Sequence, residues 1–455
     1  RRRLEGLHLP QHLDGRALVW VLLALAVGLW LAGATRPPGR WMGLSDEYDV
    51  LEYHLQVPRE YLLAGRVIPL EHNCYSFYPL GVEMLYLLAM CLRSGAYEGM
   101  YLAKLLHGAY GVLAVAGVFA ALRRDDEPRA RFAAALLGTC PFVIYLGWLA
   151  LTELAQVCCL AAALLWLRHW LARPDHRSAA CAGAMLGAAC ATKYLSVPLV
   201  AGPVLCVMLL ASVRSAARLR HVVLAAAAAA LLAAPWPVRN LAATGNPVFP
   251  LATDLLGRGH WSQTSAQRWA NGHAADWPAR PPVPAPPSWQ PPPEQGRLVR
   301  FYYNFLACDL FGPVMLLLAG LGACVLLAER GPRDRWDLAL AGVLGLQLAA
   351  WTALTWMPPR FAAPAAVPAC LLAAGVLARL VRVRANPFRR HAVPPVRGPW
   401  GLAPAVAVFL AAAGVNLVIA YNLHAHYTRG MAGFNGVPGE EFTRRNELLW
   451  WYQDA

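Results

Sequence analysis

Residues 17–34 read ALVWVLLALAVGLWLAGA, an apolar run that contains no charged residue. About 20 apolar residues are needed for a helix to cross the hydrocarbon core of a bilayer. Comparable runs recur along the chain, among them Leu306–Ala328 and Leu402–Tyr421. Of the 455 residues, 58% are hydrophobic and only 15% are charged, whereas soluble domains carry about 25% charged residues. The sequence therefore predicts an all-α integral membrane protein.

Eleven segments are predicted to span the membrane. They lie near residues 17–35, 99–122, 132–150, 153–171, 179–192, 195–213, 221–238, 304–328, 337–356, 362–381 and 401–422. With these spans, the arginine clusters between them all fall on one side, and such enrichment marks the cytoplasmic side. The net charge of +14 is therefore assigned to topology and not to nucleic-acid binding. We expect a multi-pass protein of the inner (plasma) membrane, with its chemistry on the outer face.

The first outer loop, residues 36–98, is unusually rich in polar groups. Residues 45–83 read SDEYDVLEYHLQVPREYLLAGRVIPLEHNCYSFYPLGVE, a concentration of acids, aromatics and histidines directly after a membrane span. Plain connections are shorter, so this loop is interpreted as a functional site. Within it, Leu80–Leu92 is too short to span and is predicted to be an interfacial or re-entrant helix.

Composition predicts the domain boundaries of the chain. Residues 1–422 are predicted to form one polytopic domain, and residues 423–455 a short outer tail. A second outer segment, residues 239–303, is rich in tryptophan and contains the run PPVPAPPSWQPPP. Proline excludes regular helix from that run. We expect the tryptophans to lie at the membrane interface, where the segment covers a site.

Charged groups near the outer membrane surface are candidates for catalysis and for phosphate binding. A carboxylate near the membrane surface is suited to act as a general base when it is partly desolvated, and Asp49 follows the end of the first span by only a short stretch of chain. Lys104 and Lys193 are the two lysines in a chain with 40 basic residues, and Lys193 interrupts an apolar stretch. Arg360, between Pro359 and Phe361, suits bidentate binding of phosphate oxygens. Fixed cations of this kind stabilise a leaving phosphate.

Ordered motifs along residues 15–365 resemble those of bacterial GT-C-type glycosyltransferases, the polytopic enzymes related to protein O-mannosyltransferases and to the lipid A aminoarabinose transferase. The motifs are Asp49-x-x-x-Tyr53-His54-Leu55-x-x-Pro58, Tyr75-Ser76-Phe77-Tyr78-Pro79 with Glu83, Lys104-Leu105-Leu106-His107, Leu151-Thr152-Glu153-Leu154, Ala191-Thr192-Lys193-Tyr194, Pro235-Trp236-Pro237-Val238-Arg239-Asn240, Thr244-Gly245-Asn246-Pro247, and Pro359-Arg360-Phe361-x-x-Pro364. The resemblance implies a GT-C-type bundle and transfer of a sugar from a polyprenyl-phosphate carrier to an acceptor on the outer membrane face.

The resemblance also implies roles for individual residues. Asp49 and Glu153 are expected to be catalytic, with Asp49 as the general base of an inverting displacement and Glu153 facing it. The sequence departs from the family pattern, because Asp49 is followed by Val50 and the second acid is Glu rather than Asp. Asp46 and Glu47 are therefore the competing assignment for the base. The residues expected to bind substrate are Tyr53, His54, Lys104, Lys193, Tyr194, Arg239 and Arg360.

Simpler interpretations of these residues stay open. Glu153 suits the first turn of the following helix, Lys193 and Arg360 suit interface anchors, and the tyrosines suit an aromatic belt. His54 suits a hydrogen-bonding role in the loop. Glu153 is alternatively a ligand for a divalent ion, but two carboxylates make a poor site, so no metal site and no required cofactor is predicted.

Two other functions are consistent with a polytopic chain of this kind. One is a transporter or flippase of lipid-linked glycans, and the other is a non-catalytic scaffold derived from a transferase. The expected partners are a lipid-linked sugar donor, membrane lipids and an acceptor that is a lipid, a glycan or a protein. The sequence does not distinguish among these acceptors.

Overall fold

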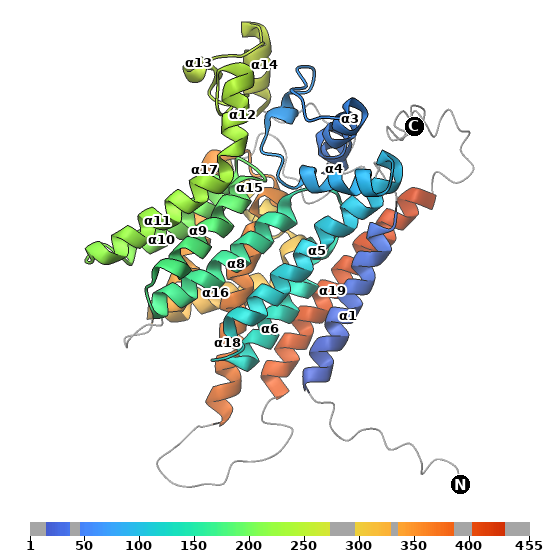
Figure 1. Ribbon diagram of the computed structural model, residues 1–455. Helices are drawn as coiled ribbons and strands as arrows, with labels where there is room; N and C mark the ends of the chain where they lie inside the picture. The colour runs from blue at the N-terminus through green and yellow to red at the C-terminus, as the bar shows by residue number, and fades with distance from the viewer. Residues whose placement is uncertain (1–14, 37–45, 274–295, 329–334, 386–402, 433–455) are drawn as a thin grey trace.

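The computed structural model describes residues 15–36, 46–273, 296–328, 335–385 and 403–432. Within these ranges the regular structure is helical and includes no β-strand. The long helices form a bundle, and shorter helices gather at one end of it (Figure 1). We call this the outer end, because it contains the polar segments predicted to face outward.

Seven helical segments of the described residues are long and apolar enough to cross a membrane, or eight if one bent pair is a single span. The helices of these segments are α1 (Gly15–Ala34), α5 (Ala96–Leu122), α8 (Glu153–Ala172), α11 (Ala216–Ala233), α17 (Arg335–Leu354), α18 (Ala366–Ala385) and α19 (Ala403–Ala432). The chain is thus a multi-pass helical membrane protein. The predicted total of eleven spans remains a prediction, since the other segments form shorter helices.

Prolines account for several of the shorter helices. The predicted span 132–150 is two helices, α6 (Glu127–Thr139) and α7 (Pro141–Gly147), bent by 51° at Pro141. The predicted helix 304–328 is wrong in its first part. There the chain forms a π-helix, Tyr302–Leu306, and a 3₁₀ turn, Asp309–Phe311, before α16 (Pro313–Ala328). Gly312 has a φ of 75°, and Pro313 lacks the N–H that would continue a helix across it.

Two further boundaries differ from the predictions. The segment 195–213 begins as a π-helix, Val197–Ala201, and continues as α10 (Gly202–Leu210). The last helix, α19, extends through Ala432 and so includes the first ten residues of the predicted tail 423–455. The rest of that tail and the proline-rich run lie outside the described residues.

Small residues allow close packing inside the bundle. Helix α8 contacts α5 and α9 (His176–Cys190), and α9 in turn contacts α11. A Cβ added to Gly183 or Gly187 of α9 would collide with the backbone of α11 at Ala225 or Ala229. Such spacing of small residues is common where membrane helices approach closely. The segment 359–381 contains most of α18. It is almost entirely buried by the other helices and forms the centre of the bundle.

The first outer loop folds into short helices above the bundle. They are α2 (Asp46–Asp49), the π-helix Val50–His54, α3 (Gln56–Ala64), the 3₁₀ turn Cys74–Phe77 and α4 (Glu83–Leu92). The predicted short apolar helix therefore forms, with α4 packed against α3 and α5.

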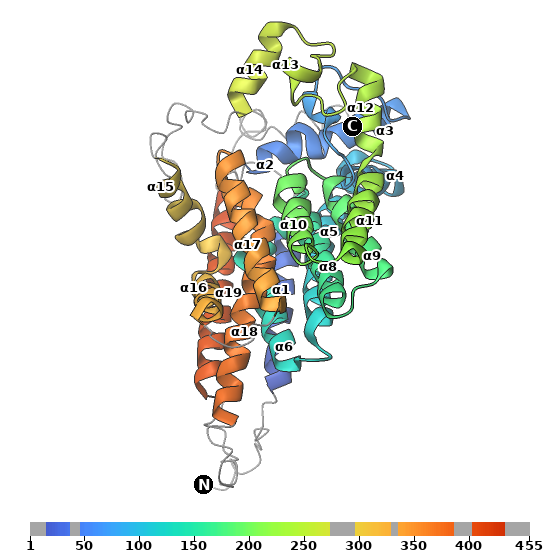
Figure 2. The ribbon, with the colours of Figure 1, turned by 90° about the vertical axis from the view of Figure 1, so that its left-hand side faces the viewer.

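The second outer segment folds into α12 (Pro235–Thr244), α13 (Thr253–Leu256), α14 (Gln263–His273) and α15 (Arg297–Phe301). Helices α12 to α14 lie at the same end of the bundle as α2 and α3 (Figure 2). The rings of Phe77 and Phe249 are 5.0 Å apart, and His260 Nε2 donates to the carbonyl of Glu71 over 3.1 Å. The second segment thus packs directly on the first outer loop, and the expected place of its tryptophans at the membrane interface stays a prediction.

Candidate active site

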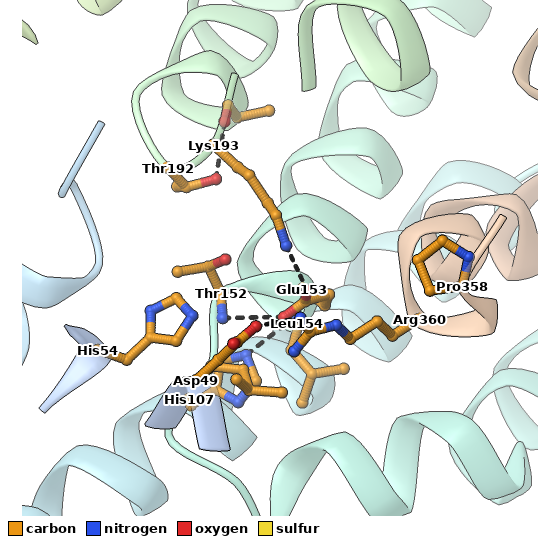
Figure 3. Close-up of polar contacts among 12 residues, drawn as sticks. Asp49, His54, His107, Thr152, Glu153, Leu154, Thr192, Lys193, Pro358 and Arg360 are labelled. Atoms are coloured by element: carbon orange, nitrogen blue, oxygen red, sulfur yellow. Dashed lines mark hydrogen bonds and ion pairs between the residues drawn. The ribbon is translucent and has the colours of Figure 1, made fainter. Parts of the chain in front are cut away.

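Four charged side chains from four separate segments meet at the outer end of the bundle. Asp49 ends α2, Glu153 begins α8, Lys193 lies between α9 and the next helix, and Arg360 lies in the 3₁₀ helix Pro359–Ala365. Arg360 Nη2 pairs with Asp49 Oδ2, and Lys193 Nζ donates to Glu153 Oε1 over 2.6 Å (Figure 3). We call these four residues the outer charge cluster. It brings together both predicted catalytic acids and two of the predicted phosphate-binding cations.

The cluster is largely removed from solvent. The side chains of Glu153, Lys193, Arg360 and Asp49 are exposed by 1%, 12%, 12% and 21% respectively. Asp49 is therefore the most accessible of the four. Burying charges is costly unless they are paired, and here each carboxylate has a cation within contact distance.

The start of α8 holds Glu153 in place. Glu153 Oε2 accepts a hydrogen bond of 3.2 Å from the backbone N–H of Thr152, where the helix dipole also favours a carboxylate. His107 of α5 fixes the same turn, since its Nε2 accepts from the N–H of Leu154 over 3.1 Å. Its Nδ1 donates to the carbonyl of Leu149 over 2.7 Å. Glu153 thus occupies a helix N-terminus, as its simpler interpretation predicted, and faces Lys193 as well.

Lys193 and Arg360 share an aromatic neighbour. Lys193 Nζ lies 4.5 Å from the ring centre of Phe361, and the Arg360 guanidinium carbon lies 5.4 Å from the same centre. Attraction between a cation and the face of an aromatic ring is stronger away from water. Phe361 therefore holds the two cations side by side, a role that the sequence interpretation missed. In the sequence, only the position of Phe361 directly after Arg360 in a motif could have indicated this role.

An aromatic wall adjoins the cluster on the side of the first outer loop. The rings of Tyr53 and Tyr75 stack at 4.7 Å, and Tyr78 lies 6.3 Å from Tyr53 and 5.8 Å from Tyr194. Burial raises the pKa of the Tyr53 hydroxyl well above its ordinary value, and the negative charge of Asp49 adds to that effect. Burial also raises the pKa of Tyr194 to about 12. These tyrosines stay neutral and act as apolar or hydrogen-bonding groups.

Arg239 and Tyr194 connect the wall to α12. Arg239 Nη2 donates to the carbonyl of Ser76 over 2.7 Å, and Asn240 Nδ2 donates to the carbonyl of Phe77 over 2.6 Å and to Tyr194 Oη over 2.9 Å. Both side chains therefore hold the turn Cys74–Phe77 in position. The predicted contact of Arg239 with substrate stays a prediction. Asn240 was quoted in a motif but not assigned a role.

The observed hydrogen bonds of Lys104 are with the C-terminal end of α1. Its side chain is fully buried in α5, and Nζ donates to the carbonyls of Gly33 over 3.3 Å and Arg36 over 2.5 Å. These acceptors lie at the end of α1, whose last carbonyl groups lack helical partners. The observed contacts of Lys104 are those of a helix cap, and its predicted role in phosphate binding stays a prediction.

Two acids of α2 compete with Asp49 for the role of the base. Asp46 and Glu47 lie in α2, but their side chains are outside the described part of the structure. Among the described residues, no three His, Cys, Asp or Glu side chains are grouped as metal ligands would be. Both acids of the outer charge cluster already contact a cation, so the described residues do not fit a metal site and no chemical step is assigned to one.

Comparison with known proteins identifies the fold. Residues 78–238 match the family model described as dolichyl-phosphate-mannose-protein mannosyltransferase, and a search of curated proteins finds no match. The structure is similar to ArnT from Cupriavidus metallidurans in the apo state, with a TM-score of 0.58, 14% identity and coverage of 92% of this chain and 77% of that chain. The chain has the GT-C glycosyltransferase fold.

Two further structures share this GT-C fold. ArnT from Cupriavidus metallidurans bound to undecaprenyl phosphate gives a TM-score of 0.56 at 16% identity, covering 92% of this chain and 78% of that one. The apo oligosaccharyltransferase of Archaeoglobus fulgidus gives a TM-score of 0.51 at 14% identity, and the match covers 90% of this chain and 56% of that one. The predicted GT-C resemblance is thus confirmed. Glu153 and Lys193 lie inside the matched family segment, whereas Asp49 and Arg360 lie outside it.

Proposed function

We propose that the protein is a membrane glycosyltransferase that moves a sugar from a polyprenyl-phosphate carrier to a hydroxyl group of an acceptor. The observation that carries this proposal is the outer charge cluster, in which two carboxylates and two cations from distant segments are held together. The family model that matches residues 78–238 is named for a dolichyl-phosphate sugar. The structurally similar ArnT has been captured with undecaprenyl phosphate. Both findings support a lipid phosphate as the donor's leaving group.

In the proposed reaction the acceptor oxygen attacks the anomeric carbon of the donor sugar. The bond between that carbon and the phosphate oxygen breaks, and its electron pair stays on the phosphate. The acceptor proton passes to Asp49, the more accessible of the two acids. A single displacement of this kind inverts the anomeric configuration. Lys193 and Arg360 stabilise the departing phosphate, because fixed cations in a site poor in water act strongly on developing charge.

The ion pairs imply an exchange of partners when the donor binds. Arg360 contacts Asp49 and Lys193 contacts Glu153 in the structure, so a phosphate that takes these cations competes with the carboxylates. When Arg360 moves to the phosphate, the Asp49 carboxylate loses this ion-pair partner and becomes available to accept the proton of the acceptor. Donor binding thus prepares the base. Glu153 remains beside the N-terminus of α8, where it orients the acceptor.

A transfer assay with purified protein tests the proposal. With a polyprenyl-phosphate sugar as donor, Asp49→Asn should reduce turnover by about 10²–10⁴, which is the usual contribution of a positioned general base. Glu71→Gln, an exposed acid of the same loop, is the matched control and should retain turnover. If Asp46→Asn is inactive while Asp49→Asn is active, the base is Asp46. Uptake of lipid-linked glycan into vesicles without transfer would instead support a transporter.

We further propose that the site faces outward from the plasma membrane. The support is the arginine-rich composition of the connections at the opposite end of the bundle, which is typical of the cytoplasmic side. Arg66 and Asp125 are exposed in the first outer loop and after α5. Arg66→Cys and Asp125→Cys, in a background without the natural cysteines, should be labelled from opposite sides by an impermeant thiol reagent. Labelling of both from the same side would contradict the topology.

A further inference from the structure

His54 is the last residue of a π-helix that directly follows Asp49. The π-helix covers Val50–His54 and is closed by the N–H of Leu55 bonded to the carbonyl of Val50. In an α-helix, residues five apart point in directions roughly 140° apart, whereas the i to i+5 bonding of a π-helix brings them closer to alignment. Figure 3 shows the His54 ring at the edge of the outer charge cluster, and the charges of Glu153, Lys193 and Arg360 act on it. π-Helices of this length are frequent at functional sites.

His54 is bonded on one ring nitrogen to a buried acid. His54 Nδ1 and Glu83 Oε1 are 2.6 Å apart, and the two side chains are exposed by only 3% and 1%. Glu83 is the first residue of α4 and comes from the motif of the first outer loop. Glu83 was quoted in that motif without a role. The pair therefore fixes the orientation of the ring.

The other ring nitrogen has no partner in the described structure. His54 Nε2 and Glu83 Oε2 are both buried atoms without a hydrogen bond. Buried polar atoms in folded proteins are nearly always bonded to protein or water, so an exception calls for an explanation. His54 is also within the electrostatic influence of Glu153, Lys193, Arg360 and His107. An unpartnered nitrogen surrounded by these groups is positioned to contact a ligand of the cluster.

Burial determines where the proton of the pair resides. It lowers the pKa of His54 well below its ordinary value, against the opposing effect of Glu153. It raises the pKa of Glu83 to about 8, although Lys193 and Arg239 act in the opposite direction. At neutral pH both groups are then uncharged. In such an uncharged pair, a Glu83 carboxyl that donates to His54 Nδ1 leaves the ring proton on Nε2.

We propose that Glu83 is a positioning residue that keeps the proton of His54 on Nε2, and that this N–H donates a hydrogen bond to a phosphate oxygen of the lipid-linked donor. This inference rests on the proposed function. A phosphate oxygen is the acceptor that the surroundings favour, since Lys193 and Arg360 attract an anion to the same place. A neutral donor adds a directed hydrogen bond there and adds no further charge to the buried cluster.

Titration of the full-length protein in detergent with undecaprenyl phosphate tests this inference by calorimetry. His54→Asn retains a polar atom near the position of Nδ1 and lacks Nε2, so it should weaken binding by about tenfold. Glu83→Ala should weaken binding similarly, because the tautomer is no longer fixed. Glu83→Gln donates to Nδ1 as a protonated acid does and should restore most of the affinity. The affinity of the wild type for undecaprenyl phosphate should fall as the pH rises through about 8, because Glu83 then loses its proton. Glu83→Gln cannot lose a proton there, so the fall caused by Glu83 should be absent from that variant.

Several outcomes would overturn the inference. If Glu83→Gln binds as weakly as Glu83→Ala, an ionised Glu83 is required and the proposed uncharged pair is wrong. Equal affinity of the wild type and all three variants would show that His54 has no contact with the donor. Thermal unfolding of each variant identifies any loss that comes from misfolding, and a folded His54→Asn then decides the question.

Two further probes separate the sources of affinity. Undecaprenol, which lacks the phosphate, should bind independently of His54, and a dependence on His54 there would contradict the phosphate contact. Inorganic phosphate should show the same His54 dependence at lower affinity. If the wild type does not bind undecaprenyl phosphate at all, the proposed donor is wrong, which is distinct from a failure of the His54 contact alone.

Discussion

Two buried ionic groups lie at opposite ends of the bundle and differ in how fully they are satisfied. At the end away from the outer loops, Arg129 of α6 pairs with Asp337 of α17. Arg379 of α18 also reaches Asp337, over 3.2 Å. Arg129 Nη2 further donates to the carbonyl of Leu371 over 2.9 Å. At the outer end, by contrast, Thr152 Oγ1 and His54 Nε2 are buried beside the charge cluster without a partner.

This difference separates a structural network from a candidate active site. The Arg129 group connects three helices, and protein partners bond Nε and Nη2 of Arg129 and both carboxylate oxygens of Asp337. The outer charge cluster has neighbouring groups that only a ligand or water would satisfy. Charge burial alone therefore does not mark function, because both groups are buried. Unsatisfied polar atoms next to separable ion pairs are the more informative feature.

The largest effect on stability is expected at the Arg129 group. Asp337→Ala leaves two arginines without their carboxylate, and removal of one partner of a buried pair costs about 3–5 kcal/mol. Glu127→Gln is the matched control, since Glu127 forms a half-exposed pair with Arg131 one turn away and such pairs contribute at most about 0.5 kcal/mol. Thermal or denaturant unfolding in detergent measures both. If both variants lose similar amounts of stability, the buried Arg129 group is no more important to the fold than the half-exposed pair.

The next largest effect is expected in catalysis. Lys193→Gln or Arg360→Gln should lower kcat by about 10²–10³, the usual result of removing one electrostatic contact to developing charge. KM for the donor should rise as well, because the phosphate is also bound in the ground state. Steady-state transfer kinetics with varied donor measures both constants. Unchanged donor kinetics in both variants would reject the phosphate site.

A smaller effect is expected in the pH dependence of stability. The pKa of Glu83 is raised from its ordinary 4.5 to about 8, so the folded protein binds a proton more tightly than the unfolded chain. The contribution of Glu83 to stability is therefore present below pH 4.5 and declines as the pH rises toward 8, with a slope of at most about 1.4 kcal/mol per pH unit. The depressed pKa of His54 acts oppositely, lowering stability as the pH falls below 6.5.

Unfolding of the wild type and Glu83→Gln across pH 5–9 isolates the Glu83 contribution. The stability of the variant relative to the wild type should increase with pH up to about 8 and then level off. A constant difference at every pH would mean that Glu83 does not titrate in this range in the folded state.

The smallest effect is expected in donor binding. Asp49→Asn removes the carboxylate that competes with phosphate for Arg360, so undecaprenyl phosphate should bind about tenfold more tightly, or about 1.4 kcal/mol. The same variant is expected to lose turnover, so binding and catalysis change in opposite directions. Glu71→Gln, which changes an exposed acid of the first outer loop, is the control and should not tighten binding. Weaker binding by Asp49→Asn would contradict the exchange of partners.

Sequence patterns predicted the helical membrane class and most of the candidate site. Apolar runs determine where long helices form, because a bilayer requires about 20 such residues. Ordered motifs selected Asp49, Glu153, Lys193 and Arg360, which the structure brings together. Lys193 was selected by its interruption of an apolar stretch together with its place in an ordered motif. The roles of these residues remain proposals, but their convergence follows from motifs that each lie at an outer helix end.

Tertiary structure alone decided which groups contact one another. The pairs Asp49–Arg360 and Lys193–Glu153 join residues separated by 311 and 40 positions, and no local pattern encodes such a partner. The observed contacts of Lys104 are at the end of α1, although its sequence context resembled that of Lys193. The bond between His54 and Glu83 depends on a π-helix and on α4 packing beside it. Local sequence sets helix formation and burial, whereas hydrogen-bond partners are set by how the helices pack.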